Sequence, residues 1–168
     1  MQLHFTLMNE TINSAEFDCD NEDLNSFFKN TSLLFQQRHF GITMACLEVS
    51  NRMVVGYYTL CPASIQREML SEKMLTGPRP NPIPGFRLCR LAIDKCYQRK
   101  GIGKRLLVHA LKKCVNQSKE IGGSIVIIDA KNQKAKEFYE HFGFKALPDN
   151  FLVLVQTIKQ IEKNFLEA

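Results

Sequence analysis

The longest predicted elements are helices, because apolar residues return every three or four positions in two stretches of the chain. The first stretch is Ile102–Ser118, and Gly122 and Gly123 behind it are typical of a helix end. The second is Gln133–Phe142, which Gly143 ends in the same way. Each helix therefore has one apolar face that can cover a sheet.

Runs rich in β-branched and aromatic residues predict the strands of that sheet. Thr43–Val49 and Met53–Leu60 flank the polar triplet Ser50–Arg52, which indicates a hairpin. Ser124–Ile128 is apolar from its second residue onward, as is typical of a strand buried on both faces. The remaining strands are predicted at Phe86–Ile93 and Phe151–Val155.

Four less regular segments complete the prediction. A helix opens within Asp18–Asn30, with Asp20 as its capping residue, and a short helix is predicted for Ile65–Leu75. Pro78–Gly85 has four prolines at alternate positions, so this segment is extended. A last helix is predicted for Thr157–Leu166.

The order of these elements predicts a single α/β domain, of the layered α+β type with a mixed sheet, that spans residues 1–168. The composition is that of a globular protein, with 45% hydrophobic and 23% charged residues. No stretch approaches the roughly 18 apolar residues that cross a bilayer. The first basic residue is Lys29, so we expect no secretory signal and a cytoplasmic location.

The six cysteines form no Cys-x-x-Cys pair, so the sequence predicts neither a disulfide framework nor a metal site. Cys46, Cys61, Cys89 and Cys114 lie in apolar runs, and we expect them to be small buried side chains. Cys89 stands beside Arg90, but a nucleophilic cysteine needs an adjacent base, and the sequence places none nearby.

Charge is distributed unevenly around a net value of +5. Residues 1–50 have a net charge of −5, whereas Lys95–Lys119 contains eight Lys or Arg residues and no Asp or Glu. Such a segment attracts phosphate-rich partners, although a solvated helix face has the same composition.

The most informative segment joins the strand that ends at Ile93 to the helix that begins at Ile102. Its glycines, Gly101 and Gly103, allow successive backbone N–H groups to point inward together. The start of the helix adds unpaired N–H donors and a partial positive charge. The surrounding cationic side chains are Arg99, Lys100, Lys104 and Arg105. These features predict an anion site, most simply for a phosphate or pyrophosphate, and an ordinary tight turn is the alternative.

Two familiar phosphate loops do not fit this segment. A P-loop requires Ser or Thr after its lysine, but Arg105 follows Lys104. A dinucleotide fingerprint requires a third glycine where this chain has Leu106.

Two motifs of the chain resemble those of the GCN5-related N-acetyltransferases, the GNAT superfamily. Gln98–Gly103 matches the Q/R-x-x-G-x-G/A pyrophosphate loop, and Ala130–Phe144 is similar to the helix N-x-x-A-x-x-F-Y-x-x-x-G-F. The order of predicted elements agrees over nearly the whole chain. The resemblance implies the GNAT fold and an N-acetyltransferase that takes acetyl-CoA between two splayed parallel strands.

A narrower resemblance is to the acetyltransferase toxins of bacterial type II toxin–antitoxin modules. The segments Phe17–Phe28, Val55–Leu60, Arg90–Asp94 and Ala130–Lys131 carry it. Pro62 and Asp20 depart from the toxin pattern; Pro62 bears on the acceptor pocket, and Asp20, in place of a usual glycine, is expected to matter little.

This narrower resemblance implies a substrate and partners. The substrate is aminoacyl-tRNA, whose acetylated α-amino group blocks translation, and the partner is a ribbon-helix-helix antitoxin. A homodimer is an assembly that the family often forms, and no membrane partner is implied. Which amino acid or tRNA is acetylated does not follow from the sequence.

The resemblance also assigns residues to the cofactor. Backbone groups of Leu91, Ala92 and Ile93 would contact the pantetheine arm, and an N–H there would polarise the thioester carbonyl. Asn132 and Phe138 are also assigned to cofactor binding. The pyrophosphate loop comprises Gln98, Arg99, Lys100, Gly101, Ile102, Gly103 and Lys104.

Tyr139 is the expected general acid, because a phenol can give a proton to the leaving thiolate. The alternative for Tyr139 is a packing role beside Phe138. No general base is evident; His109 and His141 are the nearest candidates by motif. A base is dispensable if the amine of the aminoacyl ester is already largely neutral at pH 7.

Four basic residues are candidates for tRNA contact: Arg90, Lys131, Lys134 and Lys136. Arg90 either pairs with an acidic side chain of the fold or faces the acceptor. The three lysines either form a solvated helix face or extend a basic rim for the tRNA phosphates.

Three functions remain open on the sequence alone. The leading prediction is a toxin that acetylates aminoacyl-tRNA. The second is a housekeeping GNAT enzyme that acetylates a small amine, a peptide or a protein N-terminus. The third is a catalytically silent GNAT-fold module that binds nucleic acid or a protein. Tyr139 together with Gln98–Gly103 argues for turnover.

Overall fold

The computed structural model of the chain describes residues 1–74 and 77–167. The strands are β1 (Leu3–Leu7), β2 (Ile42–Glu48), β3 (Val54–Ile65), β4 (Ile83–Ile93), β5 (Ile125–Asp129), β6 (Lys145–Ala146) and β7 (Val153–Thr157). The helices are α1 (Glu22–Ser26), α2 (Ser32–Gln37), α3 (Ile102–Ile121), α4 (Gln133–His141) and α5 (Ile158–Glu167). The shorter helical turns are a π turn at Phe27–Thr31 and 3₁₀ turns at Arg67–Met69, Glu72–Met74 and Lys95–Tyr97.

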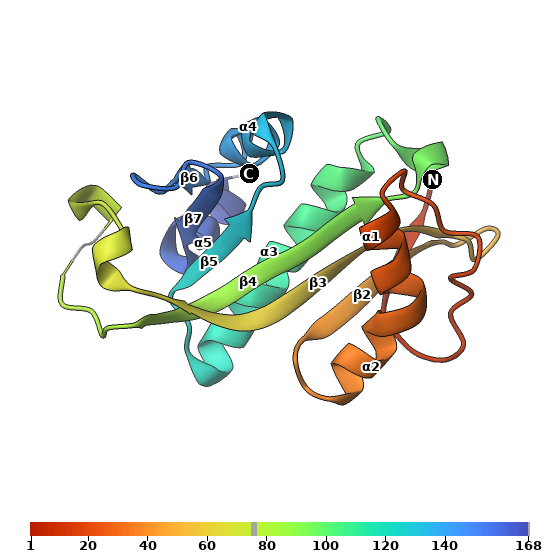
Figure 1. The fold of residues 1–168 in the computed structure, drawn as a ribbon, viewed down its shortest axis with the longest axis horizontal. Helices are drawn as coiled ribbons and strands as arrows, with labels where there is room; N and C mark the ends of the chain where they lie inside the picture. The colour runs from red at the N-terminus through yellow and green to blue at the C-terminus, as the bar shows by residue number, and fades with distance from the viewer. Residues whose placement is uncertain (75–76, 168) are drawn as a thin grey trace. The chain divides into compact units, whose positions relative to one another are not determined.

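The strands form one mixed sheet in the order β1-β2-β3-β4-β5-β7-β6, flanked by helices (Figure 1). β4 and β5 are its parallel pair. The predicted fold class, an α/β layered domain with a mixed sheet, is confirmed.

The described chain divides into two compact units. Unit 1 consists of Met1–Cys61 with Cys89–Ala110, and unit 2 consists of Pro62–Leu88 with the chain from Leu111 onward. β4 and α3 each contribute residues to both units. That the whole chain is a single domain stays a prediction.

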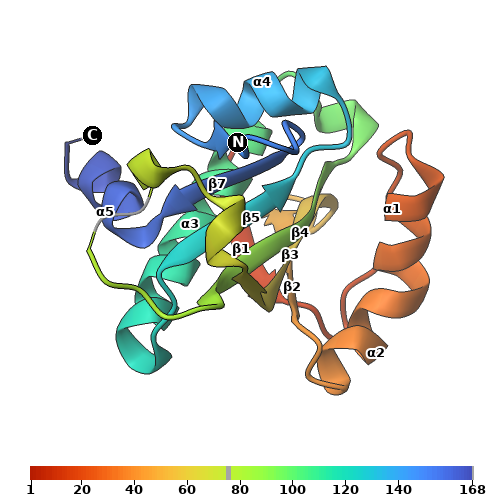
Figure 2. The ribbon, with the colours of Figure 1, turned by 60° about the vertical axis from the view of Figure 1, so that its left-hand side comes forward.

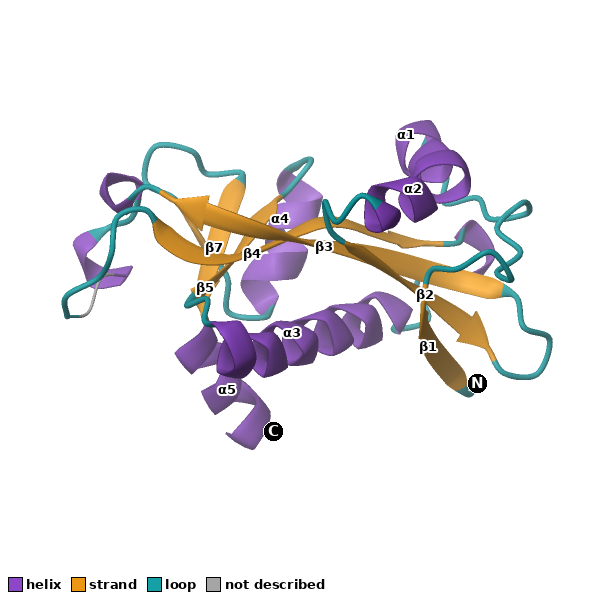
Figure 3. Cartoon of the chain, turned by 90° about the horizontal axis from the view of Figure 1, so that it is seen from below, coloured by secondary structure: helices purple, strands orange, loops and turns teal. Residues whose placement is uncertain are grey.

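The core of unit 1 lies on both sides of β3, since neighbouring residues of a strand face opposite ways. Tyr57 stacks on the fully buried Phe28, with ring centroids 4.4 Å apart. Tyr58 faces the other way, and its hydroxyl lies 2.8 Å from Nδ1 of His109 in α3. Figure 3 shows the corresponding layers, with α1 and α2 on one face of these strands and the start of α3 on the other.

The first helix begins at a different residue from the one predicted. The Asn21 side chain caps it by accepting the N–H of Leu24 at 3.1 Å. Asp20 instead has a φ of 60°, in the left-handed region that favours glycine. Aspartate tolerates that region better than most residues. The helix then continues beyond Asn30, through the π turn, to Gln37.

Unit 2 is built around the parallel pair and the strand beyond it. Gly85 in β4 pairs with Ile125 in β5, and β7 runs antiparallel on the other side of β5 (Figure 2). Four of the five residues of β5 are buried, as the prediction of a strand buried on both faces requires. On the helical side, Lys119 of α3 forms an ion pair of 3.3 Å with Glu162 of α5.

Several elements differ from the prediction in their bounds or in their type. Strand β3 extends to Ile65, and the following residues form two 3₁₀ turns rather than the predicted helix; residue 75, its predicted end, lies outside the described residues. The proline-rich segment is only partly extended, because residues 81 and 82 form a bend with a cis Asn81–Pro82 bond, and β4 already begins at Ile83. The predictions omit β1 and the two-residue β6.

The cysteine predictions hold for two of the four apolar positions. Cys46 and Cys114 are buried, and burial raises the pKa of each thiol to about 12. Cys61 and Cys89 are only half-buried, because β3 and β4 have partly exposed faces at these positions. Within the described residues, no helix has both the length and the apolar character that a membrane span requires.

A substitution at Gly85 tests the close approach of β4 to β5. A Cβ at Gly85 would collide with the carbonyl oxygen of Ile125 and would lie 2.6 Å from the Cγ2 of Ile125. Gly85→Ala should therefore lower the free energy of unfolding by about 3 kcal/mol. Gly122→Ala is the control, because Gly122 has a φ of 89° but open space around it. Its backbone strain should cost only about 1 kcal/mol. Equal losses in urea unfolding of the two variants would contradict the predicted collision.

Candidate functional site

The loop between β4 and α3 lies in unit 1 and has the backbone that an anion site needs. Arg99 and Gly101 have φ angles of 59° and 75°, so the chain turns sharply twice before α3 begins at Ile102. A Cβ at Gly101 would meet no atom within 4 Å, which leaves the turn open on that side. The backbone angle, and not crowding, therefore favours glycine there.

The first turn of α3 supplies hydrogen-bond donors to this loop. The Arg105 N–H donates to the Gly101 carbonyl at 3.4 Å, so the N–H groups of Ile102, Gly103 and Lys104 precede the helical ladder. The turn contains no acidic residue. The partial positive charge of the helix start therefore remains available to an anion.

The cationic side chains of the loop are accessible. Arg99, Lys100 and Lys104 are exposed, and the Lys100 ammonium lies 5.3 Å from the centroid of the Tyr97 ring. These side chains and the helix start together give the loop the positive charge and the N–H donors that a phosphate site needs.

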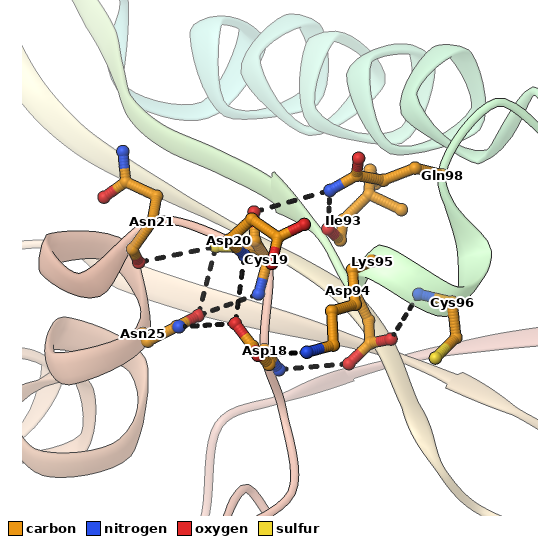
Figure 4. A network of polar contacts seen from close by, with 10 residues as sticks. All are labelled: Asp18, Cys19, Asp20, Asn21, Asn25, Ile93, Asp94, Lys95, Cys96 and Gln98. Atoms are coloured by element: carbon orange, nitrogen blue, oxygen red, sulfur yellow. Dashed lines mark hydrogen bonds and ion pairs between the residues drawn. The ribbon is translucent and has the colours of Figure 1, made fainter.

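Gln98 has an internal role that the motif does not reveal. Its Nε2 donates to the Ile93 carbonyl at 3.0 Å and to the Cys19 carbonyl at 3.4 Å (Figure 4). The side chain therefore fastens the start of the loop to the end of β4 and to the segment before α1. The backbone of Gln98, rather than its side chain, is therefore the part that can contact a ligand.

The strand end assigned to the cofactor packs tightly against β3 in unit 1. Ala92 is buried, whereas Leu91 and Ile93 are half-buried. A Cβ at Gly56 would lie 2.8 Å from the Ala92 carbonyl oxygen, so this approach requires glycine in β3. The register of β4 with β5 runs from Gly85 to Leu88, and β4 continues beyond it to Ile93.

Arg90 and His109 have partners that the sequence did not suggest. The Arg90 guanidinium lies 3.6 Å from the centroid of the Phe27 ring, a cation–π contact rather than an ion pair with a carboxylate. The His109 ring stacks on Phe5 at 3.9 Å in addition to its contact with Tyr58. Both residues thus belong to the packing of unit 1.

In unit 2, Asn132 positions the helix that carries Tyr139. Its Oδ1 accepts the Ala135 N–H at 2.9 Å and so caps α4. The side-chain NH₂ group of this exposed residue is the part left for a ligand. His141 is exposed at the other end of α4.

Tyr139 lies half-buried among aromatic rings. Phe138 is 5.2 Å away and Phe144 is 6.2 Å away, both in edge-to-face geometry. Burial raises the pKa of the Tyr139 phenol to about 12, because the charged form is disfavoured there. The phenol is therefore protonated at every physiological pH, which is the state that a proton donor requires.

The three lysines of this region are not equivalent. Lys131 and Lys134 are exposed. The Lys136 side chain is only 16% exposed, and its ammonium lies 3.6 Å from Glu140 and 5.3 Å from the ring of Phe151. Part of the charge of Lys136 is thus used within the fold, so Lys131 and Lys134 are the better candidates for an external anion.

Comparisons with known proteins identify the family. Residues 44–153 match the acetyltransferase (GNAT) domain. The chain belongs to the GNAT family.

The relatives of this GNAT chain include proteins of known activity. A tRNA-acetylating toxin of Mycobacterium tuberculosis (strain ATCC 25618 / H37Rv) is 33% identical over 106 residues, which cover 63% of each protein; the chain thus matches less than two thirds of that relative's length. The structure of AtaT complexed with acetyl-methionyl-tRNAfMet is 29% identical, with a TM-score of 0.89, over 98% of this chain and 99% of AtaT. A Tyr-to-Phe mutant of AtaT, bound to the C-terminus of the antitoxin AtaR and acetyl-CoA, is 28% identical, with a TM-score of 0.81, over 97% and 98% of the two chains.

The candidate residues of the GNAT chain form two groups, one within each unit. Unit 1 brings together the strand end and the loop, from Leu91 to Lys104. Unit 2 places Asn132, Phe138 and Tyr139 on or beside α4. No three His, Cys, Asp or Glu side chains in the described parts of the chain gather as a metal ion would require.

Sequence reasoning missed the residues that support the loop. They are Asp94, its partner Asp18, and Asn25, whose amide donates to Asp18; Figure 4 shows the three together. The sequence feature that could have identified them is the charged residue Asp94 directly after an apolar strand.

The pKa of Tyr139 can be measured directly. At pH 11 a phenol with a pKa of about 12 is about one tenth ionised, whereas an ordinary tyrosine is about nine tenths ionised. The tyrosinate absorbance at pH 11 should therefore be almost the same in the wild type and in Tyr139→Phe, with far-UV circular dichroism to confirm that both stay folded. A difference equal to one full tyrosinate would contradict the raised pKa.

Proposed function

We propose that this GNAT chain is an N-acetyltransferase that uses acetyl-CoA to acetylate the α-amino group of aminoacyl-tRNA, and that it thereby acts as a toxin that blocks translation. The observation that carries the proposal is the similarity to AtaT complexed with acetyl-methionyl-tRNAfMet, which extends over 98% of the chain. The tRNA-acetylating activity named for the mycobacterial relative supports the same substrate class.

The loop of unit 1 fits the pyrophosphate of acetyl-CoA. Its donors are the N–H groups that open α3, its turns are open at Gly101, and Arg99, Lys100 and Lys104 add charge. The Asn132 NH₂ group is assigned to the pantetheine, together with the backbone of Leu91–Ile93. Phe138 is assigned to the apolar wall of the same arm.

Bound acetyl-CoA supplies an activated thioester carbonyl, and the coenzyme departs as a thiolate that needs a proton. The chain's own contribution begins with orientation, since an N–H near Leu91–Ile93 that donates to the thioester oxygen would stabilise the developing negative charge. Tyr139 then moves a proton from its Oη to the departing sulfur. Burial keeps the phenol in its neutral form, so the proton is present on Oη when the thiolate forms.

After attack, the amide nitrogen releases its extra proton to solvent, and the Tyr139 phenolate regains a proton from solvent, so no base is required from the protein. The α-amine of an aminoacyl ester titrates near or below the ordinary range of about 7.7–8.0 for an α-amine. A large share of it is therefore already neutral at pH 7. His109 packs between Phe5 and Tyr58 in unit 1, so it is not proposed as a base.

A partner and a location belong to the same proposal. AtaT is bound to the C-terminus of its antitoxin AtaR in a structure similar to this chain, which supports an antitoxin for this chain too. We propose that this antitoxin is of the ribbon-helix-helix type and that the toxin forms a homodimer. The cytoplasm is the proposed location, because charged tRNA is found there.

Removal of one hydroxyl tests the proposed acid. Tyr139→Phe keeps the ring and its edge-to-face contacts, so the fold and the affinity for acetyl-CoA should persist. General-acid assistance typically contributes about 10²–10⁴-fold, so kcat should fall by about that factor. Wild-type turnover in the mutant would remove Tyr139 from the mechanism.

Incubation with acetyl-CoA and charged total tRNA tests the substrate. N-acetylated aminoacyl-tRNA should form, while free amino acids remain unmodified, and the rate should fall steeply as salt rises. Charge reversal at Lys131 and Lys134 should raise KM for tRNA and leave KM for acetyl-CoA unchanged, with Lys159→Glu, an exposed position on α5, as the matched control. Acetylation of polyamines or peptides but not of charged tRNA would favour the housekeeping function instead.

A further inference from the structure

We propose that Asp94 is a positioning residue for the pyrophosphate loop: its buried carboxylate fixes the point at which the loop leaves β4 and ties that point to the segment before α1. The proposal rests on the proposed function in one respect, because it takes the loop as the site of the acetyl-CoA pyrophosphate. All of its contacts lie within unit 1.

Asp94 forms hydrogen bonds with backbone groups in three parts of the chain. The residue is 7% exposed and directly follows β4. Its Oδ1 accepts the Cys96 N–H at 2.9 Å and so caps the 3₁₀ turn, and its Oδ2 accepts the Asp18 N–H at 3.0 Å (Figure 4). Its own N–H donates to the Val55 carbonyl in β3 at 3.0 Å. The carboxylate thus joins the turn after β4 to the segment before α1, and the backbone N–H of Asp94 adds a bond to β3.

Only a carboxylate suits these two contacts. Each oxygen accepts one backbone N–H, and aspartate is the side chain of this length with two acceptor atoms. Asparagine would keep one acceptor but direct an NH₂ group at the other N–H. Two donors would then face each other in a buried place, and one N–H would lose its partner.

A second layer of bonds surrounds Asp94 and extends to the loop itself. The Asp18 Oδ1 accepts the Asp20 N–H at 3.0 Å and the Asn25 amide at 2.9 Å. The Asp18 Oδ2 pairs with the Lys95 ammonium at 2.7 Å. These bonds, the one to Lys95 above all, hold the pKa of Asp18 well below its usual range.

The loop begins within the same network. The Lys95 N–H donates to the Asp18 carbonyl at 2.7 Å, and the Gln98 amide reaches both Cys19 and Ile93. The course of the chain from Asp94 to Gln98 is therefore set by protein contacts before any phosphate binds. Donors that are fixed in advance bind an anion without the entropic cost of ordering the loop.

Two acetyl donors separate positioning from general stability. Acetyl-CoA contains the pyrophosphate, and acetyl-pantetheine has the same thioester and arm without it. Asp94→Asn should lower kcat/KM for acetyl-CoA by about tenfold, the effect of one lost charge-assisted hydrogen bond. Its kcat/KM for acetyl-pantetheine should stay within about twofold of wild type, because that donor does not use the loop.

Three further variants complete the experiment. Asp149→Asn makes the same chemical change at an exposed position and should affect neither donor. Gln98→Met removes the amide donor at nearly constant length and should mimic Asp94→Asn, so it serves if the latter does not fold. Gly103→Glu places a carboxylate in the first turn of α3 and should abolish the preference of the enzyme for acetyl-CoA over acetyl-pantetheine.

The outcomes separate the positioning role of Asp94 from the assignment of the loop as the pyrophosphate site. An equal loss with both donors in folded Asp94→Asn and Gln98→Met would show a merely structural role and overturn the proposal. Wild-type kinetics with both donors in these variants would overturn it as well. If Gly103→Glu keeps the wild-type preference for acetyl-CoA, the loop is not the pyrophosphate site and the proposed function loses its cofactor site, whatever the Asp94 variants do.

Discussion

The Asp94 carboxylate is the interaction on which the arrangement of unit 1 depends. It accepts backbone N–H groups from Asp18 and Cys96, and it is nine-tenths buried at the end of β4. A buried carboxylate is costly unless its oxygens are satisfied, so the segment before α1 and the turn after β4 have to stay where they are. The same constraint determines where the loop starts and therefore where the N–H groups of α3 point.

The anion loop and the helix of Tyr139 make different physical contributions. The loop uses unpaired N–H groups, left-handed backbone and exposed cations to attract phosphate. Tyr139 instead uses burial among Phe138 and Phe144, which keeps its phenol protonated. The proposed function thus assigns substrate attraction and proton donation to elements that differ in polarity.

Local sequence patterns were sufficient to predict the elements in which apolar residues recur at a regular spacing or in which glycines mark the end of a helix. The helix that ends at Gly122 and the buried strand β5 followed from spacing alone. The edge strand β1 was missed although apolar and polar residues alternate along Leu3–Leu7, and its pairing with β2 identifies it. The capping residue was assigned one position early, because Asp20 and Asn21 are both good caps and only the backbone angle of Asp20 separates them.

The sequence predicted those candidate residues that are contiguous in the chain, and it missed the contacts between residues that lie far apart in the chain. The loop and the α4 helix are local motifs, whereas the bond between Asp18 and Asp94 joins residues 76 positions apart. The ion pair of Lys136 with Glu140 is local but competes with an equally plausible solvated face, so spacing could not assign it.

The central claim is that the N–H groups at the start of α3 hold the pyrophosphate of acetyl-CoA, and amide NMR tests it most directly. Titration of the labelled protein with coenzyme A should shift the amide signals of Gly101, Ile102, Gly103 and Lys104, and titration with pantetheine should leave them in place. Equal shifts with the two ligands, or none with coenzyme A at saturation, would contradict the account.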